Sequence, residues 1–203
     1  MPALTPRSAP KWMTDPAVNV LSRLGVTPNM LTLIGFAGNV GAAVLAADGR
    51  FLAAGIVMLA FSALDFLDGS LARATGRATP FGAVFDSMMD RLSEAAVLFG
   101  LLWYLSNLNA REEELLIFAA VVASIMVSYL RARAEIIGLK LREGVFTRTE
   151  RVLLLGGGLI LHDLLDVNIL TPVLWALALI AGFTVLQRLA MVWLKTRDMS
   201  DSA

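Results

Sequence analysis

The sequence predicts an all-α integral membrane protein with six transmembrane helices, preceded by a short amphipathic helix in the membrane interface. Composition is the first observation behind this prediction. Of 203 residues, 57% are hydrophobic and 17% are charged, whereas soluble domains have about 45–50% apolar and about 25% charged residues. The mean hydropathy is +0.71. The second observation is six apolar segments that approach the roughly 20 residues needed to span a bilayer.

The N-terminal region, residues 1–26, is predicted to remain outside the membrane core. Its first half lacks a continuous apolar stretch, so we expect no cleavable signal peptide. Asp15 can cap a helix, Pro16 suits the first turn and Gly25 suits the end. We expect this short helix to lie in the interface, and a solvated linker is the alternative.

The six predicted spans form one domain, residues 27–203. All are mainly apolar, and we expect them at residues 30–47, 51–72, 82–105, 114–136, 149–165 and 170–194. The fifth is the shortest and contains Gly156, Gly157 and Gly158. Small residues in a membrane helix more often permit close helix packing than bind phosphate. The absence of cysteine excludes disulfides and thiolate metal sites.

The distribution of lysine and arginine predicts how the protein is oriented. With six spans, both termini lie on the same side, and that side receives fifteen of the 17 lysines and arginines. Only Arg50 and Arg111 fall on the other side. Because cytoplasmic loops carry an excess of Lys and Arg, we expect cytoplasmic termini in the cell membrane.

Four aspartates lie where the second predicted span ends and the third begins. Asp65 and Asp68 are three residues apart, and Asp86 and Asp90 are four apart, so each pair shares a helix face. The short connection makes the two helices antiparallel neighbours, which allows all four carboxylates to converge. Oxygen-only ligands favour a hard divalent cation such as magnesium or manganese. Four acids could hold two such ions.

Other interpretations of these acids remain open. They could be interfacial acids paired with the nearby Arg73, Arg77 and Arg91. Acids inside a membrane also mark ion and proton pathways, so a cation transporter is the alternative from another functional class. A transporter predicts metal-dependent ion flux without nucleotide chemistry. A purely structural role in lipid interaction would leave the fixed aspartate spacing unexplained.

The acidic stretch also resembles the signature of a known enzyme family. The pattern is Asp65-x-x-Asp68-Gly69-x-x-Ala72-Arg73, followed by Gly82-x-x-x-Asp86-x-x-x-Asp90. It resembles the CDP-alcohol phosphotransferase signature at every fixed position. The resemblance implies a six-helix membrane enzyme, usually a homodimer, that transfers a phosphatidyl group from a CDP-linked lipid to an alcohol and releases CMP. CDP-diacylglycerol is the expected donor, and a diether lipid remains an alternative.

The same resemblance implies roles for individual residues. The four aspartates would hold two Mg²⁺ ions, with Mn²⁺ as a possible substitute, and Asp90 would also act as the general base. The CDP-lipid would contact residues from two segments, namely Asn29, Met30, Leu31, Thr32, Gly69, Arg73 and Thr79. The first of these segments is equally compatible with a simple helix start, in which Thr27 is the cap and Pro28 occupies the first turn.

A second basic cluster bears on the acceptor alcohol. It consists of Arg131, Arg133, Arg148, Arg151 and Arg188. Positive-inside topology alone could explain these arginines. An acceptor that carries its own phosphate would also require guanidinium groups. The surrounding sequence resembles the phosphatidylinositol-phosphate synthase branch of the family, which implies inositol 1-phosphate as the acceptor. Transfer to glycerol 3-phosphate is the alternative, because it too requires arginines.

Overall fold

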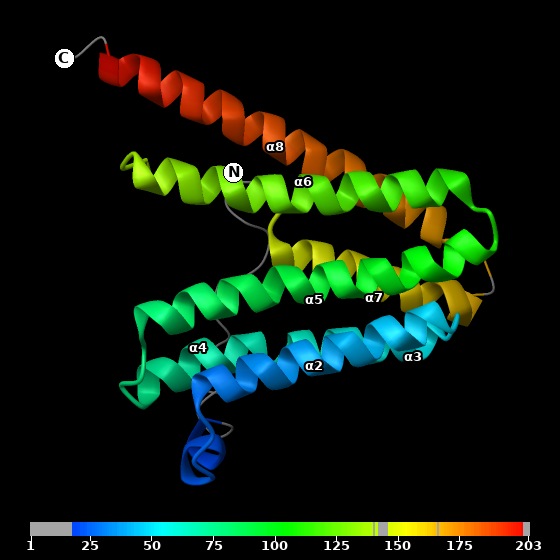
Figure 1. The fold of residues 1–203 in the computed structure, drawn as a ribbon, viewed down its shortest axis with the longest axis horizontal. Coiled ribbons are helices and arrows are strands. Elements are labelled where there is room, and N and C mark those ends of the chain that lie inside the picture. The colour runs from blue at the N-terminus through cyan, green and yellow to red at the C-terminus, as the bar shows by residue number, and fades with distance from the viewer. Residues whose placement is uncertain (1–17, 140, 142–145, 166, 201–203) are drawn as a thin grey trace.

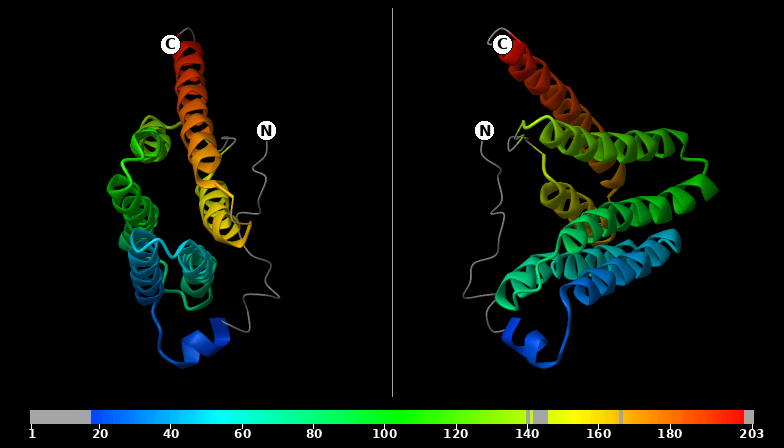
Figure 2. Two further views of the ribbon diagram at one scale, coloured as in Figure 1. Left: turned by 90° about the vertical axis from the view of Figure 1, so that its right-hand side faces the viewer. Right: turned by 60° about the vertical axis from the view of Figure 1, so that its left-hand side comes forward.

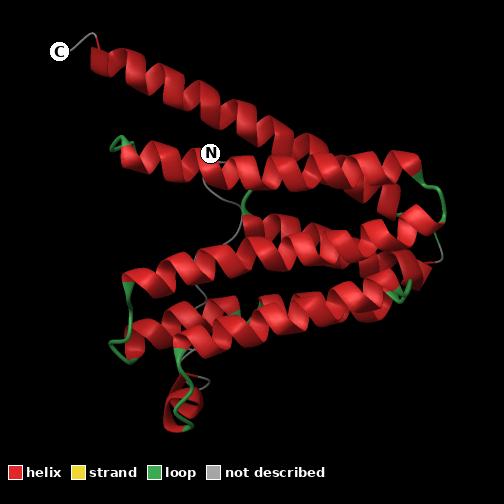
Figure 3. Cartoon of the chain, viewed as in Figure 1, coloured by secondary structure: helices red, strands yellow, loops and turns green. Residues whose placement is uncertain are grey.

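The computed structural model describes residues 18–139, 141, 146–165 and 167–200. Every regular element in this part of the chain is a helix (Figure 3). After a helical turn over residues 18–23, the helices in chain order are α2 (Pro28–Ala47), α3 (Phe51–Ser62), α4 (Asp65–Ala74), α5 (Pro80–Asn107), α6 (Arg111–Ile136), α7 (Arg148–Leu165) and α8 (Leu170–Ser200). This confirms the predicted all-α class.

The long helices close into a ring. α2 packs on α5, α5 on α6, α6 on α8, α8 on α7, α7 on α3 and α3 on α2. In the end-on view of Figure 2, α2, α5 and α6 follow one another along one side, and α7 and α8 lie along the other. α5 and α7 therefore face each other across the inside of the ring. Figure 1 shows that α4 continues from α3 toward the end of the bundle at which α2 begins.

Four segments are long and apolar enough to cross a membrane, namely Pro28–Ala47, Phe51–Ala74, Arg111–Ile136 and Leu170–Arg197. They support a multi-pass membrane protein. α5 and α7 match the other two predicted spans; α5 carries charged residues between Asp86 and Glu94, and α7 carries them in its first turn. Their uncharged stretches are consequently short, residues 95–107 in α5 and 152–161 in α7.

Helix boundaries near the site follow from local chemistry. Thr27 caps α2 by accepting a hydrogen bond from the Met30 amide, and Pro28 occupies the first turn, as the sequence predicts. Thr79 and Pro80 begin α5 in the same way. Gly25, with a φ of +74°, ends the preceding helical turn as expected. The predicted start of that turn, at Asp15 and Pro16, lies outside the described residues.

The second predicted span differs from the structure, which divides it into α3 and α4. At the junction the Leu64 amide bonds to the Phe61 carbonyl and the Leu67 amide to the Leu64 carbonyl, at 3.1 and 2.8 Å. These i→i+3 bonds tighten the helix locally. On the buried side of the junction, the Ser62 hydroxyl donates to Asn39 Oδ1 of α2 at 3.4 Å. The Asn39 amide in turn donates to the Gly35 carbonyl.

Glycines permit the closest helix contacts, as predicted for the fifth span. A Cβ on Gly156 would meet Leu59 Cδ2 at 2.6 Å, and one on Gly158 would meet Val173 Cγ2 at 2.7 Å. Gly157 faces open space and has no such role. The tightest approach to a neighbouring backbone is between α2 and α5, where a Cβ on Gly100 would lie 2.1 Å from the Ala43 carbonyl oxygen. The absence of side chains at these positions lets the backbones touch.

Candidate active site

The four aspartates converge as the sequence predicts. Asp65 and Asp68 begin α4, and Asp86 and Asp90 lie in the first three turns of α5. Asp86 interacts electrostatically with both Asp65 and Asp68, and Asp90 interacts with the other three acids. Asp68 is 5% exposed, and the other three are half-buried. Carboxylates that lie this close together and are partly shielded from water repel one another, so cations must lie nearby.

Arg148, in the first turn of α7, provides one such cation. Its Nη1 atom lies 2.6 Å from Asp65 Oδ2 and 2.7 Å from Asp90 Oδ1. This single guanidinium nitrogen therefore joins α4, α5 and α7. The sequence predicts Arg148 as a ligand for the acceptor phosphate, but the structure places it against the acids.

Asp68 and Asp65 are also fixed from α2. The Thr32 hydroxyl, 4% exposed, donates to Asp68 Oδ2 at 2.9 Å. Asp65 Oδ1 lies 3.3 Å from the position that a Cβ on Gly35 would occupy. Thr32 is predicted to contact the CDP-lipid, whereas its hydroxyl here orients a carboxylate.

The donor set suits a divalent cation. All of its atoms are carboxylate oxygens, the ligands that magnesium and manganese prefer. Asp86 Oδ1 is buried and has no hydrogen-bond partner among the described residues, so one ligand atom is available. Within those residues, no three acidic or histidine side chains are arranged to hold a metal as they stand. Arg148 contacts two of the four carboxylates, those of Asp65 and Asp90.

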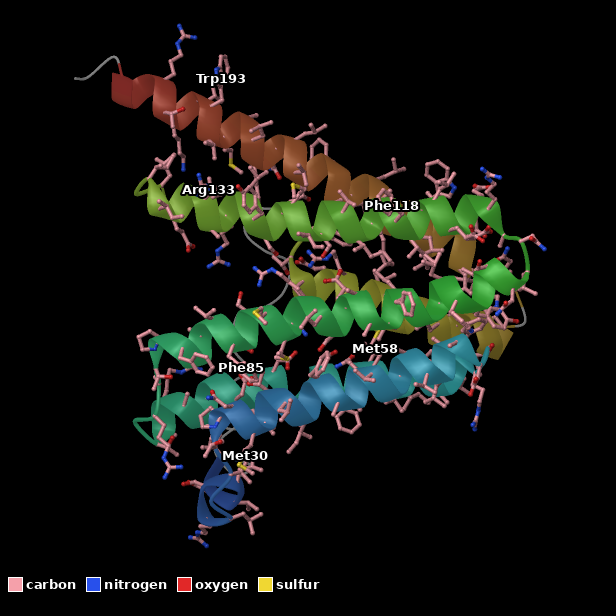
Figure 4. All side chains as sticks on the ribbon, in the orientation of Figure 1. Met30, Met58, Phe85, Phe118, Arg133 and Trp193 are labelled. Atoms are coloured by element: carbon pink, nitrogen blue, oxygen red, sulfur yellow. The ribbon has the colours of Figure 1, made fainter. Side chains whose placement is uncertain are left out.

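The residues predicted to contact the CDP-lipid lie at the starts of α2 and α5 and within α4, where Arg73 belongs to the last turn. A Cβ on Gly82 would lie 3.1 Å from Thr79 Oγ1 and 3.2 Å from Asn29 Oδ1, so the starts of α2 and α5 adjoin. One on Gly69 would lie 3.4 Å from the Arg73 guanidinium. Asn29, Met30, Arg73 and Thr79 are exposed, whereas Leu31 is buried. Figure 4 shows Met30 and Phe85 toward the same end of the bundle as Arg133.

The predicted arginine cluster separates into buried and exposed members. Arg151 is buried and makes two hydrogen bonds to Glu94 of α5, Nε to Oε1 at 2.7 Å and Nη2 to Oε2 at 2.8 Å. Both side chains are almost inaccessible, at 4% and 6%. Arg131 is instead exposed and pairs with Glu135 on its own helix. Arg133 is also exposed.

Arg188 is the buried member that lacks a carboxylate partner among the described residues. It is 7% exposed, and its Nη1 donates to the Val127 carbonyl at 2.6 Å. Its Nε atom has no hydrogen-bond partner in the described structure. It interacts electrostatically with Arg131 and Arg151. A buried guanidinium beside two others is a site that favours an anion.

Comparison with known proteins identifies the family. The profile of the CDP-alcohol phosphatidyltransferase family matches residues 25–193, most of the chain. The chain belongs to the CDP-alcohol phosphatidyltransferase family. The prediction drawn from the aspartate pattern is thereby confirmed.

Several members of the family are similar over most of their length. The chain is 37% identical to the phosphatidylinositol phosphate synthase of Mycobacterium tuberculosis strain H37Rv over 193 residues, which cover 92% of this chain and 88% of that protein. It is 40% identical over 136 residues to the archaetidylinositol phosphate synthase of Pyrococcus horikoshii, covering 66% of this chain and 70% of that protein.

Solved structures of a family member share the fold. The crystal structure of the M. tuberculosis synthase with bound CDP-DAG has a TM-score of 0.83 at 35% identity, covering 90% of this chain and 94% of that one. The structure of the same synthase with manganese and citrate also has a TM-score of 0.83, at 36% identity, covering 89% and 88%. Manganese is one of the two metals that the sequence predicts.

Sequence reasoning missed Glu94 and Asn39. Glu94 follows Asp90 by four residues, just as Asp90 follows Asp86, so periodicity alone could have placed it on the acidic face. Its partner Arg151 lies far along the chain, and nothing local indicates the pairing. Asn39 carries no sequence signal, because its amide acts through the junction between α3 and α4.

Proposed function

We propose that this family member transfers a phosphatidyl group from CDP-diacylglycerol to inositol 1-phosphate and releases CMP. The observation that carries the proposal is the 37% identity to a phosphatidylinositol phosphate synthase over 92% of the chain. The convergence of the four aspartates at the start of α4 and α5 supports it, because this site unites the residues that the family pattern requires.

The chemistry is a phosphoryl substitution in which Asp90 is the general base. The acceptor hydroxyl oxygen attacks the lipid-bearing phosphorus, its proton passes to an Asp90 oxygen, and the phosphorus–oxygen bond to CMP breaks. Asp90 suits this role because its side chain is 23% exposed and so remains accessible to an acceptor from the aqueous side. The Asp65, Asp68 and Asp86 carboxylates lie beside it in the same cluster.

Two divalent cations, Mg²⁺ or Mn²⁺, would be held by Asp65, Asp68, Asp86 and Asp90. When bound, such cations neutralise charge on the pyrophosphate and on the departing CMP. Thr32 orients Asp68 for this purpose through its hydroxyl. Asn29, Gly69, Arg73 and Thr79 would contact the CDP part of the donor.

The acceptor phosphate would bind between α6, α7 and α8. Arg188 supplies the buried guanidinium without a carboxylate partner, and Arg131 adds positive charge close by. The Arg151 guanidinium is held by Glu94 through Nε and Nη2, so Nη1 is the atom left to meet an anion. Such a pocket selects an acceptor that carries its own phosphate over an uncharged alcohol.

The proposed architecture has six spans, with α5 and α7 in addition to the four apolar segments. α7 has 18 residues, which corresponds to a length of about 27 Å, close to the hydrocarbon thickness of about 30 Å. Three of the charged residues that shorten its apolar stretch, Arg148, Glu150 and Arg151, lie at the site end, and Asp163 lies at the other end. The bias in lysine and arginine supports a cytoplasmic location for the site end and for both termini. Residues 27–203 then form a single catalytic domain, with residues 1–26 at the interface.

An assay of CMP release by the purified protein tests the proposal. The protein is given CDP-diacylglycerol and, in parallel, inositol 1-phosphate, glycerol 3-phosphate, inositol or serine, with magnesium or with a chelator. We expect turnover with inositol 1-phosphate and loss of turnover on chelation. A parallel series with a diether CDP-lipid measures donor preference, and crosslinking in membranes tests the homodimer that the family resemblance implies. Turnover with glycerol 3-phosphate alone would overturn the proposed acceptor, and metal-dependent ion flux without CMP release would indicate a transporter.

A further inference from the structure

The contacts of Arg148 differ from those of an arginine that pairs with a single carboxylate for stability alone. Its Nη1 atom alone contacts both Asp65 and Asp90, and its Nε atom is buried without a hydrogen-bond partner in the described structure. Arg151, one turn further along α7, instead uses two nitrogens on the two oxygens of one carboxylate. The Arg151 pair is matched in shape and charge, whereas Arg148 leaves hydrogen-bonding capacity unused.

The acidic cluster remains undercompensated with Arg148 in place. The four carboxylates interact with one another, and three of them, Asp65, Asp86 and Asp90, interact with the Arg148 guanidinium, while Asp86 also interacts with Arg91. Arg91 does not neutralise them through a direct ion pair in the described structure, because its Nη1 turns back to the Ser87 hydroxyl on its own helix at 2.5 Å. Divalent cations carry more charge than a guanidinium and match carboxylate oxygens better. Arg148 therefore occupies oxygen atoms for which a divalent cation would compete.

We infer that Arg148 is a replaceable counter-ion: it holds Asp65 and Asp90 together before metal binds, and metal binding frees its guanidinium for an anionic substrate. The freed side chain remains on the first turn of α7, beside Arg151 and near Glu94. The freed guanidinium would therefore lie on the side of the buried arginines that favour an anion. The identification of that anion as the acceptor phosphate rests on the proposed function, whereas the competition with metal does not.

This arrangement couples two binding events. Metal binding removes Arg148 from the acids and so strengthens anion binding, and by thermodynamic reciprocity the anion must strengthen metal binding equally. An acceptor would then be captured mainly by protein that already holds its metals. Arg148 is thus a positioning residue whose location depends on whether the acids are occupied.

Manganese binding to the purified full chain, followed by electron paramagnetic resonance, tests the inference without any turnover. Arg148→Gln removes the competing charge, so we expect it to bind Mn²⁺ about tenfold more tightly than the unmodified protein. Arg77→Gln, an exposed arginine in the loop between α4 and α5, controls for the general loss of one positive charge and should change affinity much less. In the unmodified protein, inositol 1-phosphate should strengthen Mn²⁺ binding, and in Arg148→Gln this coupling should weaken.

Thermal unfolding provides a second measurement in case Arg148→Gln is less stable than the unmodified protein. Without metal the variant should melt below the unmodified protein, and Mn²⁺ should raise its melting temperature by a larger increment. Mn²⁺ affinity that is unchanged or weaker, together with an equal or smaller increment, would overturn the inference. If Arg148→Gln tightens Mn²⁺ but inositol 1-phosphate affects neither protein, the counter-ion role stands and the proposed acceptor fails.

Discussion

Asp90 combines a charged partner, a position among the other three acids and a partly exposed side chain. It contacts Arg148 at 2.7 Å, interacts with three other acids, and retains a partly exposed side chain. Asp68, by comparison, is 5% exposed and is fixed by Thr32. The two carboxylates therefore suit different tasks, since a buried and oriented group can hold a cation and an accessible group can take a proton from an incoming alcohol.

Replacement of Asp90 by asparagine should abolish most of the activity. The amide cannot accept the proton, so CMP release should fall about 10²–10⁴-fold. The isosteric side chain should leave the helical content, measured by circular dichroism, unchanged, and Mn²⁺ binding, which the other three carboxylates still support, should weaken much less than turnover. Normal turnover by this variant would show that another group is the base.

At the scale of secondary structure, α5 and α7 are joined by side chains rather than by backbone packing. The Glu94–Arg151 ion pair spans the inside of the ring, and both of its charged side chains are buried. Burial of such a pair adds little net stability, but removal of one partner leaves an unpaired buried charge. The pair therefore fixes the first turn of α7, which also carries Arg148.

Glu94→Gln should be strongly destabilising. It leaves the buried Arg151 guanidinium without its counter-charge, at an expected cost of about 3–5 kcal/mol. The matched control is Glu135→Gln, which breaks the exposed pair with Arg131, where an i,i+4 pair contributes about 0.3–0.5 kcal/mol. Thermal unfolding in detergent compares the two variants, and similar melting temperatures would contradict the structural role given to Glu94.

The α2–α5 contact sets the distance between two helices that carry site residues. α2 supplies Thr32 and α5 supplies Asp86 and Asp90. Their closest approach, at Gly100 and Ala43, leaves no room for a side chain. An added methyl group must therefore move one helix away from the other.

Gly100→Ala should consequently destabilise the fold by about 1–3 kcal/mol through overpacking. Gly157→Ala is the matched control, because a Cβ there meets nothing within 4 Å. Alanine at this helical position should be neutral or stabilising by up to about 1 kcal/mol. The melting temperatures of the two variants provide the measurement. A more stable Gly100→Ala protein would mean that α2 and α5 can separate without cost.

For the whole molecule, the ring of helices brings distant parts of the chain to one site. Asp65 and Arg148 are 83 residues apart in sequence, and Arg188 and Val127 are 61 apart. The exposed apolar residues lie on the outside of the helices, among them Phe118, Trp193 and Leu186. This arrangement suits a protein whose polar groups face inward and whose surface faces lipid.

Labelling with a membrane-impermeant maleimide tests the six-span topology. The chain has no cysteine, so single replacements report without a background. Leu108→Cys, between α5 and α6, should react from outside intact cells. Ala78→Cys, between α4 and α5, should react only after the membrane is permeabilised. Equal labelling of both positions in intact cells would rule out a span at α5.

The sequence by itself determined the fold class, the family and the convergence of the aspartates. Those features depend on local spacing. Carboxylates three or four residues apart lie on one face of a helix, and the short connection makes the two helices neighbours. Thr27 with Pro28 likewise predicts the start of α2 from local chemistry alone.

Only the tertiary structure decided which charges meet. It assigned Arg148 to Asp65 and Asp90, paired Arg151 with Glu94, and left Arg188 buried without a carboxylate partner among the described residues. It also divided the second span at Ser62, where the hydroxyl meets Asn39. These contacts join residues from different helices, and the helix rotations and separations that create them come from packing across the whole ring. No local pattern of residues encodes such distances.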